Sequence, residues 1–325
     1  MGRRWDRVLD KTVVLSFDAS GFERHRRSFV DGELDVDLSG KTCLVTGANS
    51  GLGYATARGL ALRGASVMML CRNPERGRSA RLALVDEVSG AGAARVEERV
   101  ELAIVDLSEL SSIRAFAERL EARAVDVLVH NAGALPDQYA ETSDELELTL
   151  ATHVVGPFLL SHLLLPRLRA AEHARVIWVS SGGMYTQRLD VSALTRPMSP
   201  YDGVKAYAAT KRAQVVLSEL FAQRWRDEVD VNAMHPGWAA TPGVEQSLPR
   251  FARLLGKRLR SAEQGADTIL WLAAAKRLTG TSGGFYFDRQ AVTTHLLPAT
   301  RESDEARAAL WNTCMSLSKL EAAEV

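Results

Sequence analysis

The sequence predicts an α/β protein built as one domain on a doubly wound parallel sheet. Two observations support this fold class. Strand-like and helix-like segments alternate from residue 41 onward, and a glycine-rich turn joins the first strand to the first helix. The 325 residues are 46% apolar, which suffices for one large domain with a full core.

Seven short apolar stretches predict the strands, and helical patterns lie between them. The strands are expected at 42–45, 67–70, 100–105, 125–129, 175–179, 229–234 and 285–287. The helices are expected at 52–63, 76–88, 109–122, 143–172, 205–225 and 262–276. Crossovers of this length are right-handed, so the strands should run parallel with helices on both faces of the sheet.

Two extensions flank the predicted domain at 41–290. Residues 1–40 mix charges with isolated apolar side chains and are too apolar for a free tail. We expect this leader to pack on the core, on a partner subunit or on a membrane surface. Residues 291–325 form a C-terminal extension.

Composition argues against several classes of protein. Forty basic and forty acidic residues cancel, whereas general nucleic-acid binders have a basic excess. The three cysteines are scattered and no H-x-x-x-H pair occurs, so we expect no metal site and a reducing, cytoplasmic location. The apolar run at 154–165 is interrupted by polar residues and glycine, which favours a buried helix over a transmembrane segment, and the N-terminus lacks the apolar block of a signal peptide.

The glycine-rich turn reads Thr46-Gly47-Ala48-Asn49-Ser50-Gly51-Leu52-Gly53. Glycines at this position permit a tight turn and let the backbone approach a pyrophosphate, whose charge the next helix N-terminus stabilises. The spacing T-G-x-x-x-G-x-G differs from the general G-x-G-x-x-G fingerprint. A glycine turn by itself would be weak support, since many turns use glycine for conformational reasons alone.

Residues after the next three strands are candidates for the cofactor site, because ligands lie beyond the carboxyl ends of such strands. Arg72 follows the second strand and suits a 2′-phosphate, which favours NADP(H) over NAD(H) unless it is an ordinary exposed arginine. Asp106 and Leu107 follow the third strand, where Asp106 either meets adenine or belongs to a helix start. The turn Asn131-Ala132-Gly133 follows the fourth strand and can line the path of the cofactor.

Tyr207 and Lys211 are four residues apart and therefore share one helical face. An ammonium and a cationic nicotinamide near the phenol would lower its pKa from about 10, so that it could exchange a proton with a carbonyl or alcohol oxygen. Ser181, favoured over Ser180, could hold that oxygen. A second Tyr-x-x-x-Lys begins at Tyr201, and we reject it because Gly203 weakens its helix.

The sixth strand is followed by Pro236-Gly237 and then by Thr241. We expect this turn to run along the nicotinamide end of the cofactor, although a Pro-Gly turn alone is unspecific.

These motifs, in this order, resemble the short-chain dehydrogenase/reductase family over about residues 41–290. Cys71-Arg72-Asn73 and the long separation of Ser181 from Tyr207 resemble its retinol-dehydrogenase-like branch. The resemblance implies hydride transfer between a nicotinamide and a carbonyl or alcohol. It implies Tyr207 as the acid/base, Lys211 binding the nicotinamide ribose, Ser181 orienting the substrate, and a cofactor lined by Gly47, Asn49, Ser50, Gly51, Leu52, Arg72, Asp106, Leu107, Asn131, Ala132, Gly133, Pro236, Gly237 and Thr241.

The chain departs from the family pattern at His153. The family usually has an asparagine there, three residues before a glycine, which helps to organise a water in the proton relay. His153 either takes over that role, since imidazole can hold water and shuttle protons, or is a core histidine with satisfied hydrogen bonds.

Residues 248–260 predict an amphipathic helix with Leu248, Phe251, Leu255 and Leu259 on one side and basic residues around them. It is either a lid over a lipophilic substrate, a surface that touches anionic lipid, or an ordinary surface helix.

The main functional prediction is an NADP(H)-dependent oxidoreductase acting on a small carbonyl or alcohol. The alternatives are a non-catalytic NADP(H)-sensing protein, and a dehydratase or epimerase on the same fold, although the latter usually show T-G-x-x-G-x-x-G. Many relatives dimerise through the helices at 143–172 and 205–225, so a homodimer is a further expectation unless the leader covers that surface.

Overall fold

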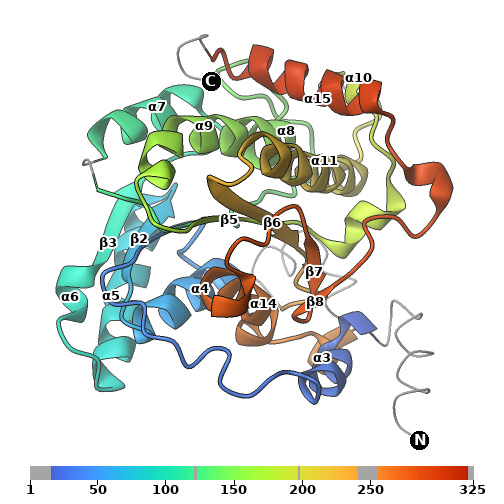
Figure 1. Ribbon diagram of the computed structural model, residues 1–325. Helices are drawn as coiled ribbons and strands as arrows, with labels where there is room; N and C mark the ends of the chain where they lie inside the picture. The colour runs from blue at the N-terminus through green and yellow to red at the C-terminus, as the bar shows by residue number, and fades with distance from the viewer. Residues whose placement is uncertain (1–15, 121–122, 197, 241–252, 254, 321–325) are drawn as a thin grey trace, which may run out of the picture.

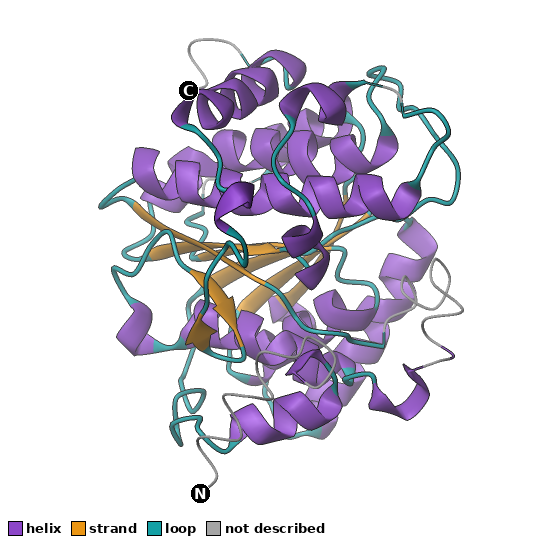
Figure 2. Cartoon of the chain, turned by 90° about the vertical axis from the view of Figure 1, so that its right-hand side faces the viewer, coloured by secondary structure: helices purple, strands orange, loops and turns teal. Residues whose placement is uncertain are grey.

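A computed structural model describes residues 16–120, 123–196, 198–240, 253 and 255–320 of the chain. One sheet lies between two layers of helices, as Figure 1 and the perpendicular view in Figure 2 both show. This is the α/β fold with a mostly parallel sheet that the alternating pattern predicts.

The described part of the chain contains one eight-stranded sheet in the order β3-β2-β1-β4-β5-β6-β7-β8. Its parallel strands are β1 (Thr42–Thr46), β2 (Ser66–Cys71), β3 (Val100–Ile104), β4 (Val127–His130), β5 (Ala174–Val179), β6 (Val229–Met234) and β7 (Phe285–Phe287). The seven predicted strands are therefore confirmed. The pattern did not predict β8 (Gln290–Ala291), which pairs antiparallel with β7 and is only two residues long.

Alternating side chains of β1 feed two separate cores. Cys43 and Val45 pack with helices on one face, and Leu44 packs on the other. The first face is covered by α4 (Gly51–Leu62), α5 (Pro74–Gly90) and α14 (Ala262–Ala274), with the short α6 (Val96–Arg99) beside them. The second is covered by α7 (Leu110–Arg119), α9 (Gly156–Arg169) and α11 (Gly203–Arg224).

Local capping explains several helix starts. Asn73 and Asp202 accept hydrogen bonds from the backbone N–H groups of the first turns of α5 and α11, and Ser261 forms a capping box with Gln264 at α14. The single helix expected at 143–172 is wrong in its start, because Glu141 and Glu147 form a β-bridge and Glu147 caps Leu150. The segment consists of α8 (Leu148–Leu150), the π-helical turn η1 (Ala151–Val155) and α9.

Within the described residues, the segment Leu148–Arg169 is the one helix whose length and composition would allow it to cross a membrane. Most of it, 89% of the apolar window, is buried inside the protein. A core helix of a soluble domain passes the same test, and the packing of α9 between the sheet and the outer helices corresponds to such a core position.

The described part of the leader packs against the main domain. The helix α3 (Ala19–Arg26) follows Phe17, whose ring contacts His235, Trp238 and Phe287 beside the end of the sheet. Arg260 is buried there and donates hydrogen bonds to Asp288 and to the carbonyl of Ser16.

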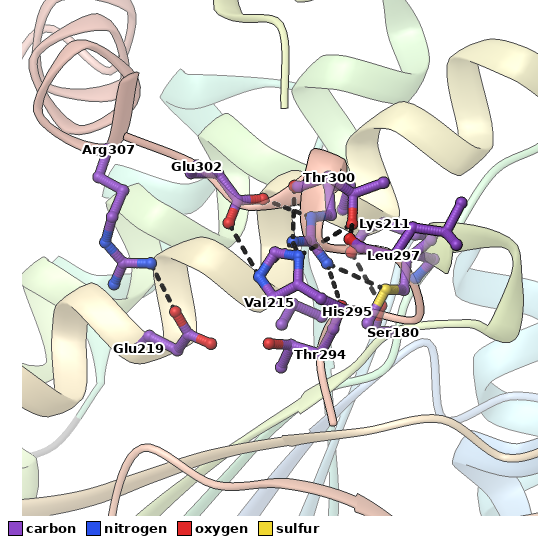
Figure 3. Close-up of polar contacts among 12 residues, drawn as sticks. Ser180, Lys211, Val215, Glu219, Thr294, His295, Leu297, Thr300, Glu302 and Arg307 are labelled. Carbon is purple, nitrogen blue, oxygen red and sulfur yellow. Dashed lines mark hydrogen bonds and ion pairs between the residues drawn. The ribbon is translucent and has the colours of Figure 1, made fainter. Parts of the chain in front are cut away.

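The C-terminal extension folds back over α9 and α11. The helix α15 (Asp304–Leu317) lies on the outer side of these helices (Figure 1), and Trp311 packs on Phe158 and Phe221. The atoms His295 Nε2 and Glu302 Oε2 lie 3.3 Å apart, and Arg307 donates to Glu219 at 2.6 Å. Figure 3 shows both contacts. The remaining short elements are α10 (Val191–Thr195), η2 (Gly182–Thr186), η3 (Gly256–Arg258), η4 (Lys276–Leu278) and η5 (Pro298–Thr300).

Candidate active site

A cavity of about 690 Å³ opens at the carboxyl ends of the strands, where the chain order reverses between β1 and β4. It unites nearly all of the predicted site residues. Those that line it are Gly47, Asn49, Ser50, Gly51, Leu52, Arg72, Asp106, Leu107, Asn131, Ala132, Gly133, Ser181, Tyr207, Lys211, Pro236 and Gly237. Thr241 lies outside the described residues, as do Leu248 and Phe251 of the expected lid.

The glycine turn has the geometry of a cradle that side chains would fill. Gly47 has a φ of 65°, and a Cβ there would meet the Cα of Ala132 at 2.9 Å. A Cβ on Gly53 would meet the carbonyl oxygen of Gly47 at 2.4 Å. The turn leads into the N-terminus of α4, whose backbone N–H groups and dipole favour a phosphate. These residues therefore fit a dinucleotide pyrophosphate.

Arg72 and Asp106 stand side by side at the far end of the cavity. The exposed guanidinium of Arg72 lies 3.9 Å from the Asp106 carboxylate. Asp106 also accepts hydrogen bonds from the backbone N–H and hydroxyl of Ser108, at 2.9 and 2.6 Å. Asp106 thus lines the cavity and shapes the turn before α7, as the helix-start alternative predicts, and its contact with adenine stays a prediction.

The loop after β4 is held from below by His153. Its Nε2 accepts a hydrogen bond of 2.8 Å from the backbone N–H of Ala134, so the ring proton is on Nδ1, which donates to Thr210 Oγ1 at 2.9 Å. His153 is fully buried, and burial lowers its pKa well below the usual range, with the Lys211 charge acting in the same direction. A Cβ on Gly133 would meet the imidazole at 3.1 Å, so His153 lies directly behind the cavity wall.

Ser181 and Tyr207 meet at the inner end of the cavity. Burial raises the pKa of Tyr207, and a hydrogen bond with the Ser181 side chain partly opposes this rise. This direction is opposite to the one expected from the Tyr-x-x-x-Lys spacing. The expected lowering relied on a cationic nicotinamide and a fully charged lysine, whereas in the protein alone desolvation of the phenolate dominates.

Lys211 lies below Tyr207, with its Nζ 5.5 Å from the centre of the phenol ring. Nζ donates to the carbonyl of Val179 at 2.8 Å and to Gln214 Oε1 at 3.0 Å. Burial lowers the pKa of Lys211 to about 7. Ser180 Oγ donates to the Lys211 carbonyl at 2.8 Å (Figure 3), so the Ser180 hydroxyl proton is already used within the protein.

The rejected Tyr201 lies outside α11 and lines a neighbouring cavity of about 410 Å³. Its hydroxyl donates to Glu147 at 2.8 Å. Gly203 does not weaken the helix as the sequence suggested, since it is the first residue of α11. A Cβ there would meet the carbonyl oxygen of Pro136 at 2.1 Å, which explains why glycine is required.

Sequence reasoning missed the residues that support the Pro236–Gly237 wall. The backbone N–H of Trp238 donates to the carbonyl of Phe17, and Arg260 Nη1 donates to the carbonyl of Pro236. A Cβ on Gly182, next to Ser181, would meet the Phe17 ring at 2.4 Å. Phe17 of the leader therefore supports the end of the cavity at Ser181 and Pro236. An isolated phenylalanine in a charged segment does not predict such a contact.

Among the described residues, no group of three His, Cys, Asp or Glu side chains is placed to hold a metal ion. The polar groups at the inner end of the cavity include the Tyr207 phenol, the Ser181 hydroxyl and the Lys211 amine, and backbone N–H groups lie at the glycine turn. Such a set can bind a dinucleotide and exchange a proton with a bound oxygen.

Comparison with known proteins assigns this arrangement to a family. The model for short chain dehydrogenase matches residues 41–250. The chain belongs to the short-chain dehydrogenase/reductase family, whose members are oxidoreductases that use a nicotinamide cofactor.

Particular relatives agree with the retinol-dehydrogenase-like branch. Human dehydrogenase/reductase SDR family member 12 is 41% identical over 295 residues, which cover 90% of each chain. Bovine retinol dehydrogenase 12 is 35% identical over 299 residues, covering 90% of this chain and 91% of the relative. A Streptomyces protein with a proposed assignment as a daunorubicin C-13 ketoreductase is 36% identical over 256 residues, covering 78% and 85%.

Solved structures agree on the fold. A protein from Mycobacterium paratuberculosis is 30% identical with a TM-score of 0.69, covering 88% of this chain and 96% of that one. A Beutenbergia cavernae structure with NADP bound at low occupancy is 27% identical with a TM-score of 0.59, covering 77% and 95%.

Proposed function

We propose that this protein is an NADP(H)-dependent oxidoreductase that interconverts a carbonyl and an alcohol on a lipophilic small molecule. The observation that supports this most is the single cavity that joins the glycine turn and Arg72 to Ser181, Tyr207 and Lys211. A protein that only bound the dinucleotide would not need the second group of residues.

The residues of the inner end divide the chemistry between them. NADP(H), when bound, supplies or accepts the hydride. The Ser181 hydroxyl holds the substrate oxygen and Tyr207 donates a proton to it or accepts one from it. Lys211 binds the ribose hydroxyls, and its charge, 5.5 Å from the centre of the phenol ring, favours the phenolate. His153 takes part as a positioning residue, since it fixes the loop at Ala134 and the helix at Thr210.

The choice of NADP(H) over NAD(H) rests on charge. The side chain after β2 is the cation Arg72 in place of an acid, and its guanidinium can form charge-assisted bonds with a 2′-phosphate. The bound NADP of the Beutenbergia relative supports the same choice.

The lining of the cavity supports a lipophilic substrate. Leu135, Val204, Trp238 and Ala239 line the same cavity as Tyr207 and have apolar or aromatic side chains. The names of the relatives mention retinol and daunorubicin, and retinol is a largely apolar alcohol.

The test is oxidation of NADPH with a panel of retinal, steroid ketones, quinones and simple aldehydes. Tyr207→Phe should lower kcat by about 10²- to 10⁴-fold because it removes the proton donor, while NADPH binding changes little. Turnover that survives Tyr207→Phe would contradict the acid/base role. Tight NADPH binding with no turnover of any carbonyl by the native chain would favour a sensing protein.

A further inference from the structure

Three buried groups form a line behind the active site. Lys211 Nζ donates to Gln214 Oε1 at 3.0 Å, and Gln214 Nε2 donates to the backbone carbonyl of His153 at 2.8 Å. Gln214 is fully buried, and it lies on α11 one turn beyond Lys211. The Gln214 amide thus connects Lys211 to the helical segment Ala151–Val155.

The covalent structure explains why the His153 carbonyl accepts a side chain. In an α-helix this carbonyl would bond to the N–H of the residue four positions later, which is Pro157 and has no N–H. The chain forms the π-helical turn η1 at this point, in which the N–H of Gly156 bonds to the carbonyl of Ala151. A buried carbonyl needs a partner, and the Gln214 amide provides one.

The same amide orients the lysine. An ammonium has three N–H groups, of which one goes to the carbonyl of Val179 and one to Gln214. The third is left for the cavity that Lys211 lines. Glutamine suits this position because its amide accepts from Lys211 with one atom and donates to His153 with the other, whereas an apolar side chain could do neither.

We propose that Gln214 is a positioning residue for the reaction, which ties the Lys211 ammonium to the π-helical turn and keeps it charged and aimed at the nicotinamide end of the cavity. This inference rests on the proposed function and extends it to a residue that does not touch the substrate.

The surroundings of Lys211 make the Gln214 oxygen decisive for its charge. The titratable groups that face it are Tyr207 on the same helix and His153 on η1. Arg212 points away, toward Glu302, at 2.5 Å. His153 is neutral because its pKa is lowered. Burial lowers the pKa of Lys211 to about 7. The hydrogen bonds to Val179 and Gln214 act in the opposite direction, because they favour the ammonium.

The test compares Gln214→Met with Gln214→Glu in the full chain. Methionine has a similar length and keeps the packing but removes the acceptor, so the Lys211 pKa should fall further. The basic limb of the pH profile of kcat should move to lower pH, and kcat at pH 7.5 should fall about tenfold. Glutamate keeps an acceptor beside Lys211 and adds negative charge, so its basic limb should move to higher pH.

Ser218→Ala is the matched control. It removes a buried side-chain hydrogen bond from the same helix, to the carbonyl of Val215, without contact to Lys211. Its pH profile should match that of the native chain. The inference would be overturned if the basic limbs of both Gln214 variants lay at the same pH as in the native chain, even with a lower kcat. A purely structural role lowers the rate without moving the basic limb of the pH profile.

Failure of the proposed function is recognised separately. If the native chain reduces no carbonyl, the Lys211 charge is measured from the pH dependence of NADPH binding by fluorescence. The loss of affinity with rising pH should begin at lower pH in Gln214→Met than in the native chain. Identical binding curves would overturn the role of Gln214. If Gln214→Met does not fold, Gln214→Glu decides: its loss of affinity should begin at higher pH than in the native chain, and a curve identical to the native one would overturn the role.

Discussion

At the scale of single residues, the Lys211 ammonium is held by the Val179 carbonyl and by Gln214, with its Nζ 5.5 Å from the centre of the Tyr207 ring. Its charge at this position bears on the pKa of the phenol. The phenol is half-buried and its pKa is raised by desolvation. Under the proposed function, a charged lysine and a cationic nicotinamide would favour the phenolate, so proton exchange would depend on the presence of the oxidised cofactor.

Arg72→Ala should discriminate between the two nicotinamide cofactors. Loss of a bond to the charged 2′-phosphate should weaken NADPH binding about 10- to 100-fold, with little change for NADH. Isothermal titration with both cofactors measures this. Arg76→Ala removes a nearby exposed arginine, in the first turn of α5, and should affect the binding of neither cofactor. Equal losses for NADPH and NADH in Arg72→Ala would contradict the 2′-phosphate assignment.

His153→Ala should lower kcat about tenfold, because the N–H of Ala134 and the hydroxyl of Thr210 lose a buried partner. The shape of the pH profile should not change, since the pKa of His153 lies well below the working range. His153→Asn restores the side chain that the family usually has and should recover part of the rate. Unchanged turnover in His153→Ala would exclude both the relay and the positioning role.

At the scale of elements, α15 covers the outer side of α9 and α11, the helices through which the sequence predicts a homodimer. Trp311 packs on Phe158 and His162 of α9 and on Phe221 of α11, and the guanidinium of Arg224 lies 3.7 Å above its ring. The expected dimer through these helices would need this helix to move. Among the described residues, the C-terminal extension packs on these helices, whereas residues 16–26 of the leader pack at the end of the sheet.

We therefore predict that the full chain is a monomer in solution and that removal of residues 303–325 causes association. The truncation leaves Glu302 and its bond to Arg212 in place but exposes the aromatic side chains beneath Trp311. Light scattering after size-exclusion chromatography measures the mass. A dimeric full chain, or a truncated chain that stays monomeric, would contradict the covering role of α15.

Elements of the fold and the site differ in how far the sequence predicts them. Strand and cofactor residues follow from local patterns, because hydrophobic runs and glycine spacing act within a few positions. The contacts of Phe17, Arg260 and Gln214 are not local. Arg260 reaches Ser16 across 244 positions and Gln214 reaches His153 across 61. No pattern along the chain indicates such pairs, although Pro157 does show that the His153 carbonyl lacks the usual α-helical donor.

At the scale of the whole molecule, buried histidines link stability to pH. Burial lowers the pKa of His130 and of His235 to about 3, against about 6.5 in the unfolded chain. Between these values the unfolded chain binds more protons than the folded one, so stability is complete above pH 6.5 and decreases as the pH falls toward 3. Each histidine should remove about 1.4 kcal/mol of unfolding free energy per pH unit in that window.

Urea denaturation at pH 7.5, 6.0 and 5.0 measures this dependence. His130→Asn should reduce the change in unfolding free energy per pH unit by the contribution of one histidine. His173→Asn, at an exposed position, should leave this pH dependence intact. A native chain with equal unfolding free energies at pH 7.5 and 5.0 would contradict the neutral state of these side chains.

The packing of the leader on the end of the sheet also bears on the order of folding. His25 meets Asp288 across 263 positions of sequence, and closing so long a loop is entropically costly until most of the chain is already ordered. The substrate end of the site should consequently form after the glycine turn and its neighbouring strands. A refolding chain would then bind NADPH before it gains activity, and the interval between the two signals would report the docking of the leader.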